Sequence, residues 1–369
     1  MRFPVISFIV GTTAELIKIA PVYHAIVARG TKPQLWFTAQ HFDEVADVLE
    51  DLQLPAPDLW LVPQGKARNL ETPKQVPGWA LSVAQTAYGQ RKQLRASLAT
   101  DGKPGLVIVH GDTFTTPYGS IIARRLLGAR VAHVEAGMRS GSVLSPLPEE
   151  LNRRIASKFT DIHFAPSQNE VDNLRGARGV VVNTGANTVI DAMRLAINST
   201  TTEDLPEEFG LATLHRFELV SRTDKFREAL ELLKKASEQT PMLYLAGAPE
   251  RERIERHGWG HLFDGERFIM RPKKRYLQFL PILARAKFVV TDSGGLQQEC
   301  SYIGMPCAIH RERTETKQGL GQNIVLTGMD TRKLEQFLGE YETLRRPSIM
   351  EEYHPSEVIA DTLAQLGYL

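Results

Sequence analysis

Cysteine is scarce in this chain of 369 residues, which carries only two, Cys300 and Cys307. Two neighbouring thiols in an apolar stretch provide no disulfide framework, which argues against a disulfide-stapled secreted fold and favours a reducing, cytoplasmic location. The opening "MRFPVISFIV" has the basic residue and apolar run of a signal peptide. No small-residue cleavage pattern follows before Glu15 and Lys18, so we expect a buried first strand there.

Long apolar runs and an excess of charge are missing as well. No apolar stretch approaches the ~20 residues that cross a bilayer. Lys plus Arg at 44 and Asp plus Glu at 43 leave a net charge of +1. A chain without a basic field is poorly suited to hold DNA or RNA. We therefore expect neither a nucleic acid nor a membrane as a partner.

Several catalytic signatures do not occur. The G-x-G-x-x-G fingerprint and the G-x-x-x-x-G-K-[ST] loop are both missing, which argues against a dinucleotide dehydrogenase and a P-loop NTPase. The segment "HGWGH", 257–261, has two histidines at i, i+4. It lacks the acid of an H-E-x-x-H zinc helix, and the chain has no G-x-S-x-G elbow. No metal site and no serine nucleophile are predicted.

What the chain does have is a regular alternation of short apolar runs with segments of helical periodicity. Its length exceeds what one core usually organises, so two domains are expected. The alternation predicts an α/β fold of two doubly wound domains, each with a parallel sheet. Helical periodicity is clear at 15–28 and 80–98. The predicted strands cover residues 5–10, 34–38, 106–110, 130–134, 161–165, 179–183, 210–214, 242–246, 267–270, 287–291, 307–310 and 323–327.

The ligand site is expected at the carboxyl ends of these strands, where the loops into the following helices meet. A cleft between the two domains is the default location. Turn residues at 183–191 mark the expected boundary. The stretch 63–78 is rich in Pro, Gly and charge, which predicts a surface loop.

Two strand-to-helix turns have features of an anion site. In "VGTTAELIK" a Gly follows the first strand and Lys18 lies one turn into a helix. Such a turn is equally common without any ligand. "VTDSGGLQQE" places Ser293, Gly294 and Gly295 between a strand and a helix. Bare glycine backbone lets a diphosphate approach closely, and Glu299 is placed for a ribose. The alternative is an N-cap by Asp292 or Ser293.

Three further strand ends carry titratable groups. "VHGDTFTT" follows a strand with His110 and Asp112, and Asp112 is either a helix cap or a functional acid. "LHRFE" places His215 and Arg216 after another strand, a pair suited to proton transfer beside a phosphate.

The third strand end is followed by "HVEAGMRSGSVLSPLPEELNRR", 133–154, with Glu135, Glu149 and Glu150 around a turn-rich stretch. These acids are either solvent-facing or proton-transfer groups that face a cleft.

In order along the chain, "GTTAELIKIAPV", "TAQH", "HGDTFTT", "HVEAGMRSG", "SPLPEELNRR", "HFAPS", "HRFE" and "TDSGGLQQE" resemble the non-hydrolysing UDP-N-acetylglucosamine 2-epimerases. The resemblance implies a GT-B-type fold of two Rossmann-like domains with an interdomain cleft. It implies a catalytic domain at 1–184, a nucleotide-binding domain at 185–350, and a tail at 351–369 whose helix, about 355–367, returns to the first domain. It also implies a homodimer.

The same resemblance assigns roles to individual residues. The implied catalytic groups are Asp112, Glu135, Glu149 and His215. The implied UDP-sugar contacts are Lys18, Arg154, Arg216, Ser293, Gly294, Gly295 and Glu299, with Arg154 and His215 beside the diphosphate. No cofactor and no metal are required. Glu150 is left as an ordinary acid in the first turn of a helix.

Three stretches depart from the family pattern. The family's "GTRPE" is "GTTAE" here, so Thr13 stands where a diphosphate-facing Arg is expected. "TETKQ", 314–318, and "LAGAP", 245–249, also differ, which puts substrate allostery and the identity of the sugar in question. The alternatives are a hydrolysing epimerase that releases ManNAc and UDP, a GT-B glycosyltransferase, an epimerase for another nucleotide sugar, and a silent nucleotide-sugar binding protein.

Overall fold

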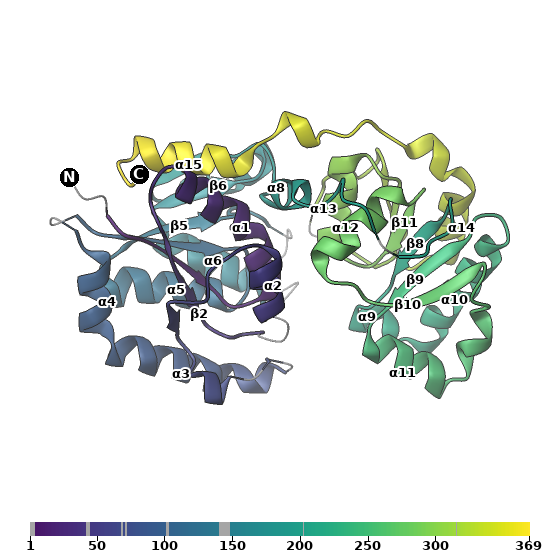
Figure 1. Ribbon diagram of the computed structural model, residues 1–369, viewed down its shortest axis with the longest axis horizontal. Helices are drawn as coiled ribbons and strands as arrows, with labels where there is room; N and C mark the ends of the chain where they lie inside the picture. The colour runs from purple at the N-terminus through teal and green to yellow at the C-terminus, as the bar shows by residue number, and fades with distance from the viewer. Residues whose placement is uncertain are drawn as a thin grey trace. The chain divides into compact units, whose positions relative to one another are not determined.

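The computed structural model describes residues 4–41, 45–67, 69–70, 72–100, 103–139, 148–201, 203–314 and 316–369. The chain divides into two compact units, Met1–Ala192 with Tyr353–Leu369, and Met193–Glu352. Each unit is built on one parallel sheet flanked by helices (Figure 1). The predicted α/β class is therefore confirmed.

The first unit contains a sheet ordered β3-β2-β1-β4-β5-β6-β7 in the described residues, with all neighbours parallel. Its strands are β1 (Ile6–Val10), β2 (Gln34–Phe37), β3 (Leu59–Trp60), β4 (Leu106–His110), β5 (Arg130–Val134), β6 (Ile162–Ala165) and β7 (Val180–Asn183). β1 and β4 are buried along their whole length, as expected of central strands covered on both faces. The strand order reverses between β1 and β4, which is where such sheets bind ligands.

The second unit contains a parallel sheet ordered β10-β9-β8-β11-β12-β13 among the described residues. Its strands are β8 (Gly210–Thr213), β9 (Met242–Ala246), β10 (Phe268–Pro272), β11 (Val289–Thr291), β12 (Cys307–Ile309) and β13 (Ile324–Leu326). The core around this sheet includes Phe226, Tyr244 and Phe288, all buried. The Tyr244 hydroxyl donates a hydrogen bond to the Leu214 carbonyl oxygen at 3.0 Å, so this large side chain is buried with its polar atom satisfied.

Helices connect the strands throughout. The α-helices are α1 (Thr13–Ala28), α2 (Val45–Asp51), α3 (Val76–Gly89), α4 (Arg91–Leu98), α5 (Thr115–Ile121), α6 (Glu149–Phe159), α7 (Gln168–Asn173), α8 (Val189–Arg194), α9 (Phe217–Val220), α10 (Thr223–Ser237), α11 (Ala248–Arg256), α12 (Tyr276–Arg285), α13 (Gly294–Ile303), α14 (Thr331–Glu340) and α15 (Pro355–Gln365). Short 3₁₀ turns are η1 (Gln64–Lys66), η2 (Pro73–Gln75), η4 (Trp259–Leu262), η5 (Tyr341–Leu344) and η6 (Met350–Glu352), and a π-helical segment, η3 (Ile122–Leu127), continues α5.

One helix prediction and one loop prediction need correction. The periodic segment 80–98 is not one helix, because the chain breaks at Gly89 and Gln90 into α3 and α4. The stretch 63–78, predicted as a loop, contains η1, η2 and the first turn of α3. The composition correctly indicated a turn-rich segment, but α3 begins at Val76, before the predicted end of the loop at residue 78.

The C-terminal helix α15 packs on α1 within the first unit (Figure 1, yellow against purple). Arg29, just after α1, donates to Glu357 at 2.7 Å and to Asp361 at 2.5 Å. The backbone N–H of Ser356 donates to Asp191 Oδ2 at 2.8 Å, close to the start of α15. The end of the chain is therefore held to the first sheet's helical layer. None of the helices in the described ranges is both long and apolar enough to span a membrane.

Candidate active site

The predicted site residues form two groups, one in each unit. In the first unit they follow β1, β4 and β5 or lie on α6. In the second unit they follow β8 or lie at the β11 to α13 turn. Most of them lie in the loops at the carboxyl ends of parallel strands or in the helices that begin there, and this is the edge at which ligands bind in such sheets.

Glu135 comes directly after β5 and has a left-handed backbone conformation, with φ +65°. Its carboxylate is 9% exposed and accepts a hydrogen bond from Lys18 Nζ, on α1, at 2.8 Å. His110, the last residue of β4, places Nε2 3.2 Å from the same carboxylate oxygen. Left-handed conformations of non-glycine residues cost about 1 to 3 kcal/mol and persist where the surroundings hold them. Here the conformation keeps the acid at the edge of the sheet.

His110 is a buried neighbour of Glu135 to which the sequence assigned no role. Burial lowers the pKa of His110 well below its ordinary value, and the charge of Lys18 lowers it further. The ring is therefore neutral at neutral pH, and Lys18 supplies the positive charge beside Glu135. The only sequence signal for this contact is that His110 and Glu135 come at the ends of two strands. These strands, β4 and β5, are adjacent and end at the same level.

Asp112 follows β4 and forms an ion pair with Arg153 of α6. The Arg153 side chain is 4% exposed, and Asn152 Nδ2 donates to the backbone oxygen of Asp112 at 2.9 Å. The structure thus brings Arg153 to this acid. Arg154, which the resemblance assigns to the diphosphate, donates to Glu150 Oε1 at 2.8 Å, and its side chain is 43% exposed.

Glu150 is in the first turn of α6 as expected, but its side chain is fully buried. Besides Arg154, its carboxylate lies 3.6 Å from Arg153 and 3.9 Å from Arg139. It is therefore an internal counterion rather than an ordinary surface acid. Glu149, one position earlier, is half-buried. Residues 140–147 of the predicted site segment lie outside the described residues.

Glu15, within the "GTTAE" stretch, is a second buried acid that sequence reasoning did not single out. It accepts hydrogen bonds from the N–H groups of Gly11 and Thr12, at 2.7 and 3.0 Å, and from the hydroxyl of Thr113 at 2.8 Å. Burial raises its pKa to about 7 against these bonds. It completes a capping box with Thr12 and joins the loops after β1 and β4. The S/T-x-x-E pattern at 12–15 was the available signal.

In the second unit, His215 and Arg216 follow β8 and are organised by Asp292, which follows β11. The buried Asp292 accepts the backbone N–H groups of His215 and Arg216 at 2.9 and 2.8 Å. Its other oxygen lies 3.2 Å from His215 Nδ1. Burial lowers the pKa of His215, and the Asp292 charge opposes this shift. Because the Asp292 carboxylate faces Nδ1 and orients the imidazole ring, the other ring nitrogen, Nε2, is left for proton transfer.

The turn into α13 has Ser293 as its N-cap, with Oγ accepting from Leu296 N at 3.4 Å. Of the two capping candidates, Ser293 has this role and Asp292 does not. A Cβ added to the exposed Gly295 would meet no atom closer than Ser293 Oγ at 3.8 Å. Internal packing therefore does not require this glycine, and its backbone is left accessible at a helix N-terminus.

Glu299 is 7% exposed, one turn further along α13. The hydroxyl oxygen of Tyr276, at the start of α12, is buried near it. Burial raises the pKa of Tyr276 well above its ordinary value, and the nearby Glu299 carboxylate adds to the shift. The phenol therefore remains protonated and able to donate toward the acid. In the described part of the chain, no three His, Cys, Asp or Glu side chains gather to hold a metal ion.

The family model for UDP-N-acetylglucosamine 2-epimerase matches residues 25–353. The UDP-N-acetylglucosamine 2-epimerase of Bacillus subtilis is 31% identical over 341 residues, covering 88% of this chain and 84% of the relative. The chain belongs to the UDP-N-acetylglucosamine 2-epimerase family. It is thus a member of a family of nucleotide-sugar isomerases, which confirms the resemblance drawn from the eight motifs.

Two further comparisons bear on the fold and the sugar. The Neisseria meningitidis UDP-GlcNAc 2-epimerase structure, bound to UDP-GlcNAc, is 25% identical with a TM-score of 0.77, covering 98% of this chain and 99% of that one. The UDP-2,3-diacetamido-2,3-dideoxy-D-glucuronate 2-epimerase of Pseudomonas aeruginosa is 31% identical over 318 residues, 83% of each protein. The fold extends over the whole chain, while relatives of similar identity carry names with different sugars.

Proposed function

We propose that this protein interconverts UDP-GlcNAc and UDP-ManNAc. The observation that carries the proposal is the buried Glu135, held by Lys18 and His110 at the strand edge where Asp112 also lies. Binding a nucleotide sugar does not by itself require two positioned acids beside each other. Proton transfer does, because groups on different sides of a carbon must remove and return its hydrogen.

The hydrogen on C2 of a hexosamine is not acidic, so direct proton exchange there is too slow. In the proposed route the C1–O bond breaks and UDP leaves with the electron pair. The C2 proton passes to a base, giving a 2-acetamidoglucal. UDP then adds back to C1 while a proton is delivered to the opposite face of C2. Asp112, Glu135, Glu149 and His215 are the proposed proton carriers. Lys18 and Arg153 place positive charge beside Glu135 and Asp112, and burial lowers the pKa of His215.

Departure of UDP requires positive or dipolar groups at the diphosphate. The proposed contacts are Arg154, Arg216 and the turn of Ser293, Gly294 and Gly295 at the start of α13. Lys18 is proposed as well, but its ammonium already faces Glu135. Thr13 stands at the position of the family's Arg, so Arg216 is proposed to stabilise a larger part of the diphosphate charge. Slow re-addition of UDP to the glycal is what favours a hydrolysing outcome.

A second sugar is favoured by one specific observation. The Pseudomonas aeruginosa epimerase named for a diacetamido-glucuronate is as similar to this chain as the Bacillus subtilis enzyme. Elimination across C1 and C2 serves either sugar, because both carry an acetamido group at C2. The reaction class is therefore common to both proposals, and the substituents at C3 and C5 distinguish them.

The test is proton NMR of the purified protein with UDP-GlcNAc in D2O, and in parallel with the diacetamido-glucuronate nucleotide. UDP-ManNAc with deuterium at C2 supports the first proposal, and turnover of the second substrate alone supports the second. Free ManNAc with UDP identifies a hydrolysing enzyme. No deuterium exchange with either nucleotide sugar contradicts the elimination route. Sedimentation velocity in the same buffer tests the proposed homodimer.

A further inference from the structure

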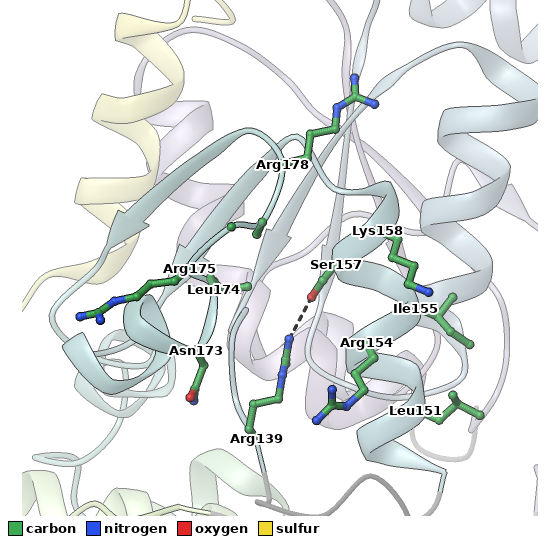
Figure 2. A pocket seen from close by; sticks show the side chains of 12 residues that line it. Arg139, Leu151, Arg154, Ile155, Ser157, Lys158, Asn173, Leu174, Arg175 and Arg178 are labelled. Carbon is green, nitrogen blue, oxygen red and sulfur yellow. Dashed lines mark hydrogen bonds between the residues drawn. The ribbon is translucent and has the colours of Figure 1, made fainter.

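A pocket of about 600 Å³ lies between α6 and the turn that joins α7 to β7, wholly within the first unit (Figure 2). Five of its twelve lining residues are cationic, and none of the twelve is acidic. The cationic residues are Arg139, Arg154, Lys158, Arg175 and Arg178. The volume is within the range of small-ligand sites, about 300 to 1,000 Å³. A pocket of this size with one sign of charge attracts ligands of the opposite sign.

Two of these cations are engaged elsewhere. Arg175 pairs with Asp172 at 2.9 Å, and Arg178 lies 3.5 Å from Asp161. In Figure 2 both side chains extend away from the middle of the pocket. The remaining three are Arg139, Arg154 and Lys158. Arg154 is itself paired with Glu150 at 2.8 Å, which leaves Arg139 and Lys158 available to a second ligand.

Arg139 is the most constrained of the three. Its side chain is 17% exposed and donates to the Met138 carbonyl oxygen at 2.7 Å and to Ser157 Oγ at 3.4 Å. Figure 2 shows it extending toward Ser157, with the guanidinium of Arg154 facing the same part of the pocket. Burial lowers the pKa of Arg139, the charge of Glu150 opposes this shift, and the charges of Arg154 and Arg153 lower the pKa again. These guanidinium groups therefore repel one another.

In the described ranges, the acids that pair with these cations are fewer than the cations. Glu150 is shared by three guanidinium groups, with Arg154 at 2.8 Å, Arg153 at 3.6 Å and Arg139 at 3.9 Å, and Arg153 also pairs with Asp112. Lys158 has no carboxylate within ion-pair distance in the described ranges. An additional anion bound in the pocket would relieve this repulsion.

We infer that this pocket binds an anion of the phosphate class, with Arg139 and Lys158 as its charged contacts. A guanidinium fork matches the oxygens of a phosphate, and an ammonium adds a point charge. Ser157 offers a hydroxyl beside Arg139, and the apolar Ile155 and Leu174 on the walls leave room for an organic group. The inference does not rest on the proposed epimerase reaction, and it leaves Arg154, which also lines the pocket, to the diphosphate of UDP.

The experiment is calorimetric titration of the full-length protein with pyrophosphate in the presence of saturating UDP. The variants are Arg139→Gln and Lys158→Gln. Lys92→Gln, which removes an exposed cation on α4, is the matched control. We expect pyrophosphate to bind the wild type and the control equally, and each pocket variant at least ~10-fold more weakly, as for loss of a charged hydrogen bond. Lys158 is exposed, so its replacement leaves folding intact.

Inorganic phosphate and glucose 1-phosphate are then titrated to identify the ligand's form. Tighter binding of glucose 1-phosphate assigns an organic phosphate to the apolar walls, and equal binding assigns the inorganic ion. Failure of pyrophosphate to bind beside UDP overturns the inference, and so does equal affinity in Lys158→Gln and the wild type.

Discussion

Lys18 Nζ and Glu135 Oε2 lie 2.8 Å apart and join α1 to the loop after β5 across 117 residues of sequence. The pair compensates the charge of a largely buried acid, whose backbone is in the left-handed conformation. The charge of Lys18 is therefore already partly neutralised by Glu135, so in the proposed mechanism Lys18 cannot act on a diphosphate alone.

Glu135→Gln should abolish turnover while it preserves the shape of the site. The amide is close in size to the carboxylate but cannot accept a proton, and general acid–base groups contribute about 100-fold or more to rate. We expect kcat to fall by at least ~100-fold, with little change in UDP affinity measured by calorimetry. Glu231→Gln, in an exposed pair on α10, is the control and should retain full activity. Full turnover in Glu135→Gln would remove this residue from the proposed mechanism.

Arg153→Met should destabilise the protein much more than the loss of an exposed arginine. Its side chain is 4% exposed, and removing it leaves Asp112, which is 31% exposed, without its paired cation, while Glu150 keeps Arg154. We therefore expect a loss near the lower end of the range of about 3 to 5 kcal/mol found for buried pairs. Arg256→Met, which breaks an exposed pair with Glu252, should cost less than about 1 kcal/mol. Urea unfolding of both variants measures the difference. Equal midpoints would show that Arg153 is not an internal counterion.

The sequence predicted the sheets well, because a continuous apolar run indicates burial on both faces whatever its neighbours are. Each of the twelve predicted runs contains a strand, and β3 was missed because two residues carry no periodicity. The strand-end position of the acids followed from topology alone. The pairing of Arg153 with Asp112 did not, because it depends on which side of α6 packs against the loop after β4, and adjacent residues on a helix differ by about 100° in direction. The burial of Glu150 and the pairing of His110 with Glu135 depend on how α6, β4 and β5 pack.

The buried Glu15 should make stability depend on pH near neutrality. Its pKa is raised from 4.5 to about 7 in the folded protein. A raised pKa means that the folded state favours the protonated acid. Its contribution is therefore complete below pH 4.5 and is lost as pH rises to about 7. Relative to Glu15→Gln, the wild type should lose on the order of 3 kcal/mol over this window. Urea unfolding at intervals from pH 4.5 to 8 measures this loss. A difference that does not vary with pH would contradict the assignment.

Asp292→Asn should move the acid limb of the activity profile to lower pH. His215 acts as a base only when neutral, so kcat declines as pH falls through its pKa, which burial places below 6.5. The Asp292 charge raises that pKa, and the asparagine oxygen still accepts the N–H groups of His215 and Arg216. Removing the charge therefore lowers the pKa further. The measurement is kcat against pH for both proteins, and an unmoved limb would show that His215 does not set the rate.

Glu299 should determine how strongly the protein distinguishes a ribose from a deoxyribose. The acid is nearly buried on α13, beside the hydroxyl of Tyr276, which stays protonated. The carboxylate is proposed to accept the two hydroxyl groups of a ribose. Losing a hydrogen bond to a charged group costs about 1.5 to 3 kcal/mol, so Glu299→Gln should bind UDP about 10- to 100-fold more weakly. The same variant should lose less affinity for 2′-deoxy-UDP, because that ligand lacks the 2′-hydroxyl and offers the acid only the 3′-hydroxyl of the pair. Calorimetry of both proteins with both nucleotides gives the loss of affinity for each nucleotide, and the difference between the two losses measures the contact with the 2′-hydroxyl. Equal losses for UDP and 2′-deoxy-UDP would mean that Glu299 supports α13 and does not contact the ribose 2′-hydroxyl.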